Sequence, residues 1–326
     1  MSYLDQRTPF EWRDEGMETS VIIPTYKRTD DLKRCLEGLS RQLYKPDEVI
    51  VIVRDTDDQT ASFLKDYQSI ISIKQAIVTR PGQVAALNEG LQQAAGEFIC
   101  ILDDDTVPHT HWLQKIIDIF KSSDQIGGVG GRDWVVHGNY KEDGRKDPVG
   151  KVQWFGRVIG NHHLGYGEAR DVDVLKGANM SYRRQAIAGL TFDERLLGQG
   201  AQVHNDMAFS LSVRKRGWRL VYDPEAAVDH YPAPRFDLDQ RGRFNKEAYL
   251  QGVFNETLIL SEYMSNPIRK LLYIGWSIMI GTSDRPGILQ LIRLFKKNPK
   301  SNFQKFSVNI HTRLGFQKKL KTIVRS

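Results

Sequence analysis

The sequence predicts an α/β fold built around a mostly parallel sheet that is flanked by helices. Three observations predict it: short apolar runs alternate with segments of helical spacing, the runs are apolar at nearly every position, and polar motifs follow their ends. Helices that connect parallel strands cover both faces of the sheet, which explains strands that are apolar throughout. In such folds a ligand binds beyond the carboxyl ends of the strands.

Each predicted element carries a local signal. SVIIPTY is an apolar strand that ends in a Pro turn, and the next segment places Leu32, Leu36 and Leu39 at helical spacing behind a Thr or Asp cap. DEVIVIV and EFICIL are also buried strands by composition. The predicted strands are 20–26, 47–53, 72–79 and 97–102, and the predicted helices are 29–42, 60–68 and 84–96.

Composition excludes several classes of protein. With 326 residues, 40% hydrophobic and 26% charged, the chain suffices for one large folded domain plus an appendage, and it is not disordered. Cys35 and Cys100 form neither a framework of pairs nor a metal-ligand pattern, which favours a reducing cytoplasm.

Residues 1–20 lack the apolar core of an export signal, and no run reaches the roughly 18 to 20 apolar residues of a spanning helix. We expect a cytoplasmic protein, soluble or lying on a surface.

Charge is distributed unevenly along the chain. Residues 269–326 hold 13 Lys and Arg against one acid, Asp284, although the whole chain carries only +6, so the preceding residues are net acidic. The segments 267–281 and 287–297, which follow a predicted helix at 245–264, combine apolar faces with clustered cations. Such helices can lie at the inner face of an anionic membrane. Two alternatives to membrane contact stay open: these helices could pack against the preceding domain or against a second subunit in a homodimer. The basic segment has no nucleic-acid reading motif, so no nucleic-acid partner is expected.

The stretch ICILDDDTVPHTHW places three consecutive carboxylates, Asp103, Asp104 and Asp105, directly after a buried strand. One of them could cap a turn or the helix that we expect from about Thr110. Capping uses one carboxylate, however, and a hard divalent cation uses more. Mg²⁺ or Mn²⁺ commonly binds one or two carboxylates together with substrate phosphates and water. The triplet therefore predicts a metal-bound diphosphate.

Taken together, these segments resemble the family 2 glycosyltransferases, which have the GT-A fold. The resemblance runs from about Ser20 to Arg235 and consists of SVIIPTYKR, EVIVIVRDTDDQT, LNEGLQQAAGEFICILDDDTVP, LKGANMSYRR and HNDMAFSLSVRKRGWRLVYDPEAAVDH. It implies a metal-dependent, inverting transfer of one sugar from a nucleotide-diphosphate donor, with UDP favoured, to a glycan or lipid-linked acceptor. We expect a GT-A domain at 18–235. Outside the resemblance, we expect an N-terminal extension at 1–17 and a basic, partly amphipathic helical C-terminal region at 236–326.

The resemblance implies a set of donor-binding residues. Tyr26 would place its ring against the base, although it could equally be a half-buried loop aromatic, and Asp55 would accept the N3 proton of uracil. The usual acidic pair at this strand end reads Arg54-Asp55 here, and the role of Arg54 stays open. The full set is Pro24, Thr25, Tyr26, Arg28, Asp55, Arg80, Asp103, Asp104, Gly177, Ala178 and Asn179.

For the metal, Mn²⁺ or Mg²⁺, the resemblance implies Asp105, with Asp103 and His230 as further ligands; a structural role for His230 is the alternative. For the catalytic base it implies Asp206, because transfer to a hydroxyl needs a carboxylate that takes the acceptor's proton. The sequence departs from the family here, since the first acid of the usual pair is Asn205. A helix cap is the alternative for Asp206, and Asp193 and Glu194 are the fallback bases.

Other residues carry weaker expectations. Arg183 and Arg184 could lie near the phosphates or face solvent, and His162 and His163 lack ligand spacing. Aromatic residues between 127 and 173 suit either an acceptor site or a packed hairpin; they are Trp134, Trp154, Phe155 and Tyr166.

Rival functions are less favoured. A sugar-nucleotide nucleotidyltransferase should have a Gly-rich, Arg-containing loop after the first strand, and PTYKRTDD has none. A processive synthase should have a Q-x-x-R-W element and spanning helices, which are absent from the sequence. A noncatalytic binding module of the same fold would keep the sheet and lose the acids, and here the acids are present.

Overall fold

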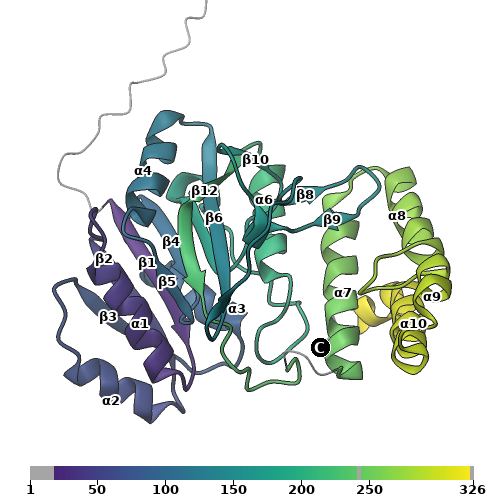
Figure 1. Cartoon of the computed structure of the whole chain (residues 1–326), viewed down its shortest axis with the longest axis horizontal. Coiled ribbons are helices and arrows are strands. Elements are labelled where there is room, and N and C mark those ends of the chain that lie inside the picture. The colour runs from purple at the N-terminus through teal and green to yellow at the C-terminus, as the bar shows by residue number, and fades with distance from the viewer. Residues whose placement is uncertain (1–17, 241–243, 324–326) are drawn as a thin grey trace, which may run out of the picture.

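The computed structural model describes residues 18–240 and 244–323, so the predicted extension at 1–17 lies outside the described residues. The first half alternates as the sequence predicts (Figure 1). Its elements are β1 (Thr19–Thr25), α1 (Thr29–Ser40), β2 (Glu48–Arg54), α2 (Asp58–Asp66), β3 (Ile73–Val78), α3 (Gln83–Gln93) and β4 (Phe98–Leu102). The α/β fold class is confirmed.

The second half completes the sheet with longer strands. It contains β5 (Thr106–Pro108), α4 (Trp112–Ser122), β6 (Ile126–His137), β7 (Tyr140–Lys141), β8 (Lys151–Val152), β9 (Val158–Ile159), β10 (Arg170–Val172), β11 (Asn179–Arg183), α5 (Arg184–Ile187), α6 (Asn205–Lys215) and β12 (Arg219–His230). The sheet order is β10-β12-β6-β11-β4-β1-β2-β3, with β5 and β7 pairing at its rim. β11 runs antiparallel between β4 and β6, while β1 to β4 are parallel with one another.

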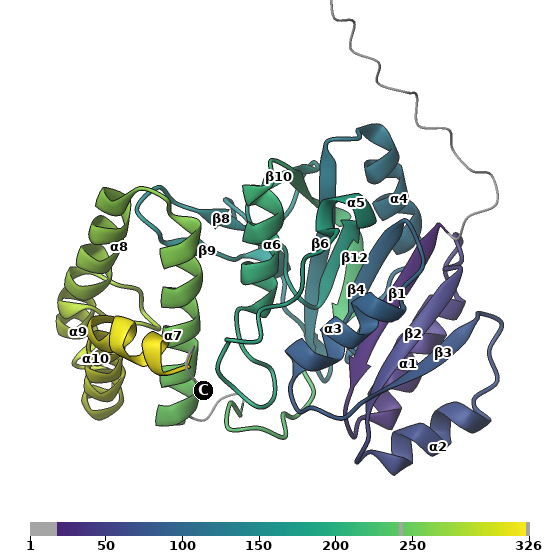
Figure 2. The ribbon, with the colours of Figure 1, turned by 180° about the vertical axis from the view of Figure 1, so that it is seen from behind.

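The apolar strands bury both of their faces, as the sequence predicts. Ile22, Ile50 and Ile52 pack in one core cluster with α3 and α6, whereas Val21 and Val51 belong to the other cluster, with α1 and α4. Alternate side chains point to opposite faces of a strand, so a strand covered on both sides is apolar at every position. Figure 2 shows α3 and α5 on the rear face.

Two predicted caps differ from the structure. α1 has Arg28 at its N-cap with no side-chain hydrogen bond, so the predicted Thr or Asp cap is wrong. The acidic triplet caps no helix either, because β5 follows it and α4 begins after His111, again without a side-chain cap. The capped-helix alternative for the triplet is therefore wrong, and its three carboxylates serve other contacts.

Four helices form the C-terminal region: α7 (Lys246–Tyr263), α8 (Pro267–Met279), α9 (Ile288–Leu294) and α10 (Pro299–Ile323). Both views place them at the end of the molecule opposite β3 (Figures 1 and 2). Phe254 of α7 and Phe316 of α10 belong to the same core cluster as Ile22 of β1. The helices therefore share the main core. Within the described part of the chain, none of the helices combines the length and apolar character that crossing a bilayer requires.

Candidate active site

A cavity of about 970 Å³ opens at the carboxyl ends of β1 and β4. Its lining comes from the β1–α1 turn, the acidic triplet, the loop 196–203 and the segment 235–239. Arg54 at the end of β2 also lines it, so the three polar motifs that follow strand ends converge here as predicted. Of the predicted donor residues, Pro24, Thr25, Tyr26, Arg28, Arg80, Asp103 and Asp104 line the cavity.

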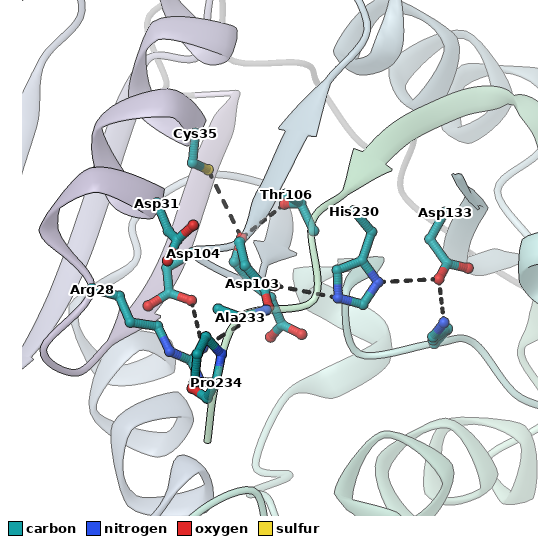
Figure 3. Close-up of polar contacts among 12 residues, drawn as sticks. Arg28, Asp31, Cys35, Asp103, Asp104, Thr106, Asp133, His230, Ala233 and Pro234 are labelled. Atoms are coloured by element: carbon teal, nitrogen blue, oxygen red, sulfur yellow. Dashed lines mark hydrogen bonds and ion pairs between the residues drawn. The ribbon is translucent and has the colours of Figure 1, made fainter. Parts of the chain in front are cut away.

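The triplet is held by side chains from the end of β1, the N-cap of α1 and the first turn of α3, and Figure 3 shows Arg28 beside Asp104. Asp104 accepts hydrogen bonds from Thr25 Oγ1 at 2.8 Å and from Arg28 Nη1 at 3.0 Å. Gln83 Nε2, in the first turn of α3, donates to Asp103 Oδ1 at 3.1 Å. Because Arg28 takes the N-cap position of α1, its guanidinium reaches the triplet from the side of the β1–α1 turn.

These carboxylates lack enough positive charge around them. Burial raises the pKa of Asp104 to about 7, although the Arg28 cation opposes the shift. Burial, followed by the neighbouring charge of Asp105, also raises the pKa of Asp103. Both causes disfavour the ionised form, so a cation arriving at this edge would relieve the strain of like charges.

Asp105 begins a chain of charged contacts that ends at Lys176, and Figure 3 shows its central pair, His230 and Asp133. His230 Nε2 lies 3.3 Å from Asp105 Oδ1, and its Nδ1 lies 3.4 Å from Asp133 Oδ2. Lys176 Nζ pairs with the same Asp133 oxygen. Burial by itself lowers the pKa of His230, but hydrogen bonds to the two carboxylates raise it to about 9. The imidazolium therefore supplies positive charge beside Asp105.

Asp133 and Lys176 were not predicted from the sequence. Asp133 is fully buried in β6, and burial raises its pKa, yet contacts with His230 and Lys176 lower it to about 2. β6 and β12 pair in parallel with Asp229 opposite Trp134, which brings His230 close to Asp133 across 97 residues of sequence. No local motif marks Asp133, because only this pairing gives it a partner.

The donor chemistry of this edge fits a hard divalent cation in part. Asp103 and Asp105 offer carboxylate oxygens, which Mg²⁺ and Mn²⁺ prefer, whereas His230 would have to lose its proton before its imidazole could coordinate a metal. No group of three or more His, Cys, Asp or Glu residues in the described part of the chain could hold a metal ion by itself. A cation that takes the rest of its ligands from substrate phosphates and water fits the carboxylates at this edge and also the lack of a complete set of protein ligands.

Asp206 lies in the first turn of α6, next to the donor segment. Its Oδ2 accepts from Gly177 N at 3.0 Å, and its Oδ1 accepts from Met207 N at 2.8 Å. His204 occupies the N-cap position of α6. Asp206 therefore does not have the N-cap role that was the alternative to its role as the base. Asp206 does not line the cavity itself. It lies half-buried behind the loop that does.

The contacts of Asn205 explain why an amide, and not the usual acid, precedes Asp206. Its Nδ2 donates to Gln83 Oε1 at 3.2 Å and to Ala201 O at 2.9 Å. Gln83 in turn donates to Asp103, so the amide at 205 connects α6 with the triplet. A carboxylate at 205 could not donate either hydrogen bond.

Several predicted residues lie away from the cavity. Asp55 pairs with Arg54 at 2.7 Å and does not line the cavity. Asn179 is buried, where it accepts from Trp112 Nε1 at 2.8 Å and donates to Ala226 O at 2.8 Å. Gly177, Ala178 and Asn179 therefore face Asp206 or the interior of the protein.

Arg183 and Arg184 take neither of the two predicted positions, which were close to the phosphates or facing solvent. Both side chains bind inside the protein, Arg183 to Glu97 and Phe120 O, and Arg184 to Gly96 O and Ala94 O. The antiparallel direction of β11 places Arg183 opposite Phe98, at the amino end of β4 and away from the triplet.

The fallback bases are also engaged. Arg80 forms two hydrogen bonds of 2.8 and 2.7 Å with Glu194, at an exposed position beside the cavity. Asp193 binds Arg195. Both carboxylates are therefore already paired with cations.

The aromatic residues between 127 and 173 serve different purposes. The Arg132 guanidinium lies 3.3 Å from the centre of the Trp134 ring, and Phe155 packs edge-on against Trp276 of α8 at 5.3 Å. Trp154 and Tyr166 are exposed. His162 is buried against Val174 O, as expected for a residue without ligand spacing.

A mostly parallel sheet whose strand ends present a buried acidic triplet to a large cavity defines the GT-A class of glycosyltransferases. Residues 17–245 match the model of the family described as "Glycosyltransferase like family 2". The chain therefore belongs to glycosyltransferase family 2, and the resemblance seen in its motifs is confirmed.

Curated relatives agree with this assignment. The chain is 22% identical over 225 residues to a glucosyl-dolichyl phosphate glucuronosyltransferase from Haloferax volcanii, covering 66% of this chain and 69% of that one. It is 25% identical over 240 residues to the amylovoran biosynthesis glycosyltransferase AmsB from Erwinia amylovora, covering 68% and 72%. A poly-β-1,6-N-acetyl-D-glucosamine synthase from Staphylococcus aureus is matched over only 50% of its length, at 23% identity over 65% of this chain.

Solved structures share the fold at low sequence identity. Mannosyltransferase PcManGT from Pyrobaculum calidifontis, in complex with GDP-Man and Mn²⁺, matches with a TM-score of 0.54 and 14% identity, covering 95% of this chain and 91% of that one. Residues 1–349 of TarS from S. aureus, in complex with UDP-GlcNAc, match with a TM-score of 0.53 and 16% identity, covering 93% and 92%. The GT-A fold is therefore confirmed.

Proposed function

We propose that this glycosyltransferase is metal-dependent and inverting, and that it moves one sugar from a UDP-linked donor to a glycan or lipid-linked acceptor. The observation that carries the proposal is the acidic triplet at the edge of a cavity of about 970 Å³, where burial raises the pKa values of Asp103 and Asp104. That volume is at the upper end of the range of small-molecule sites. Burying carboxylates without enough compensating charge is costly, which favours a ligand that brings a cation.

The donor half of the proposal uses the turn after β1. Tyr26 is exposed at the cavity and has Phe236 edge-on at 6.0 Å, so it offers a ring face to a nucleoside base. Asp55 stays the proposed acceptor of the uracil N3 proton, although it now pairs with Arg54 and would have to exchange that partner. Arg28 and Arg80 would lie near the phosphates, with Gly177, Ala178 and Asn179 shaping the sugar side.

The catalytic half assigns the metal to Asp105, with Asp103 and His230, and the base to Asp206. A bound Mn²⁺ or Mg²⁺ would neutralise the charge that develops on the departing nucleoside diphosphate. Asp206 would take the proton from the attacking acceptor hydroxyl, while Gly177 N holds one of its oxygens in place at 3.0 Å. Lys176 and Asp133 would orient His230 toward Asp105.

The acceptor class rests on the relatives. One of them is named for transfer to a glucosyl-dolichyl phosphate, which supports a lipid-linked acceptor, and two are named for amylovoran or poly-N-acetylglucosamine synthesis. We therefore place the chain in polysaccharide or cell-envelope glycan synthesis, at the cytoplasmic face of the membrane. Peripheral membrane contact through the C-terminal helices is part of this proposal, and a homodimer is its alternative.

Calorimetric titration of UDP, GDP and dTDP into the protein, with Mn²⁺ and with chelator, tests the donor and the metal. We expect UDP to bind only with the metal, Asp105→Ala to remove that binding, and Asp124→Ala to leave it unchanged, because Asp124 is exposed and far from the cavity lining. Failure of all three nucleotides to bind the folded protein would overturn the proposal in favour of a noncatalytic module.

The base is tested separately with Asp206→Asn. The variant should keep UDP binding and lose transfer by about 10²- to 10⁴-fold in kcat. A variant that instead loses UDP binding would show that Asp206 supports the donor segment and is not the base.

A further inference from the structure

The outward sides of α8 and α9 carry apolar side chains that are more than half exposed. α8 turns Tyr273 and Ser277 inward, where both are buried, and leaves an apolar stripe on its opposite side. α9 buries none of its residues. The exposed side chains, which we call the outer apolar face, are Ile268, Leu271 and Met279 of α8 with Leu289, Ile292 and Phe295 at α9.

Large apolar side chains of this face are exposed to solvent. Leu271 is 74% exposed and Ile292 is 68% exposed. α8 and α9 contact each other and are joined by a tight turn in which Gly281 pairs with Pro286. Contiguous exposed apolar surface of this kind marks a site of interaction with a partner or a membrane.

Cations surround the outer apolar face, and acids are nearly absent from it. Five exposed basic residues lie on or beside the two helices: Lys270, Arg293, Lys296, Lys297 and Lys300. The acid of this region, Asp284, has its carboxylate 3.0 Å from Lys305 Nζ. An apolar surface rimmed by cations is complementary to the interface of an anionic bilayer. Two copies of the chain meeting through this face would instead bring two basic regions together.

The β8–β9 hairpin adds an aromatic residue to the edge of this face. Trp154 lies at the hairpin tip and is 64% exposed. Arg269 Nε donates to Trp154 O at 2.8 Å, and the neighbouring Phe155 packs on Trp276, so α8 fixes the tip in place. An indole ring is suited to the boundary between lipid and water, because its body is apolar and its N–H is polar.

We propose that the outer apolar face, with Trp154 at its edge, docks on the surface of an anionic phospholipid bilayer. The apolar side chains enter the interface, and the surrounding cations meet lipid phosphates. This inference deepens the partner named in the proposed function, with the docking residues now assigned, and it does not depend on the donor or the metal.

Sedimentation of the full chain with vesicles tests this proposal. We expect binding to phosphatidylcholine vesicles that contain roughly 30% phosphatidylglycerol, weaker binding to phosphatidylcholine alone, and loss of binding as salt rises. The double variant Leu271→Glu with Ile292→Glu should lower the partition coefficient at least about tenfold, because two apolar contacts are lost. Ile70→Glu is the matched control, since Ile70 is 79% exposed and lies between α2 and β3.

The opposite results are as specific. Binding that survives the double variant, or a wild-type chain that fails to sediment with anionic vesicles, would overturn the proposal. So would a dimer in light scattering that the double variant dissociates, because the face would then be an interface between two copies. The double variant should keep the thermal midpoint of the wild type, which shows that it is folded. This control does not depend on UDP binding, so it separates this test from failure of the proposed function.

Discussion

Asp103, Asp104 and Asp105 lie together at the carboxyl end of β4, and Arg28 is the cation that contacts them most closely. In α7, by contrast, Glu256 pairs with two guanidinium groups, those of Arg285 and Arg313. Both clusters are largely shielded from solvent, and Asp104, Asp105 and Arg313 are buried. One holds an excess of negative charge, and the other holds one carboxylate between two cations.

The pKa values express this difference. Burial raises the pKa of Asp104 to about 7. Burial would raise that of Glu256 as well, but the two arginines lower it to about 2. Burial alone therefore does not decide the pKa of a carboxyl group, because charged partners can reverse the effect of burial. The network at Glu256 connects α7, α10 and the turn after α8, whereas the triplet keeps an excess of negative charge at the cavity.

The largest expected effect comes from breaking the well-paired cluster. Glu256→Ala leaves Arg285 and Arg313 without their carboxylate, and removing one partner of a buried ion pair costs about 3–5 kcal/mol. Urea denaturation should show this loss in the free energy of unfolding. A change below about 1 kcal/mol would mean that the network contributes little.

The same network predicts a pH dependence through His204. Arg285 Nη2 lies 2.6 Å from His204 Nε2, and burial, together with this cation, lowers the pKa of His204 to about 4. Below pH 6.5 the unfolded chain binds a proton that the folded chain refuses, so stability is complete above about pH 6.5 and falls toward pH 4. The loss is at most about 3 kcal/mol.

Thermal denaturation of wild type and His204→Gln across this range isolates the contribution of the histidine. The glutamine oxygen can still accept from Arg285, but it does not titrate. The variant should therefore lose less stability than wild type as pH falls. Parallel pH profiles for the two proteins would contradict the assignment.

Substituting the poorly compensated cluster should have the opposite sign. Asp103→Asn removes a buried charge and keeps an oxygen for Gln83, so we expect stability to stay level or rise by about 0.5–2 kcal/mol while metal-dependent UDP binding falls. Asp133→Asn is the control, because Asp133 is a fully buried carboxylate that is paired with His230 and Lys176. It should destabilise the protein by about 1.5–3 kcal/mol. Equal changes in the free energy of unfolding of the two variants would contradict the difference in charge compensation between Asp103 and Asp133.

The smallest effect belongs to the ion pair between Arg80 and Glu194. Both side chains are exposed, so solvent screens their attraction and the pair adds little to stability. Arg80→Gln should leave the thermal midpoint unchanged within error. Its effect on UDP affinity should exceed that of Arg34→Gln, a matched control in which an exposed arginine also loses an acidic partner. Equal affinities in the two variants would remove Arg80 from the donor site.

Much of the first half of this protein could be predicted from its sequence. The strands and helices from β1 to β4 follow from local apolar patterns, and the strand ends locate the cavity, because parallel strands bring their carboxyl ends to one edge. Thr25, Arg28 and Asp104 meet at this edge as the motif positions suggest. Their mutual hydrogen bonds could not be read from the motifs.

What the sequence determined by itself is the alternation of elements, the acidic triplet after β4 and the basic C-terminal region, since each depends on neighbouring residues. The tertiary structure decided the rest through pairings between distant segments. The antiparallel direction of β11 took Arg183 away from the cavity, and the β6–β12 pairing gave His230 its partner Asp133. The network at Glu256 likewise joins α7, α10 and the turn between α8 and α9. Such contacts leave no local pattern, because their energy depends on which distant groups are buried together.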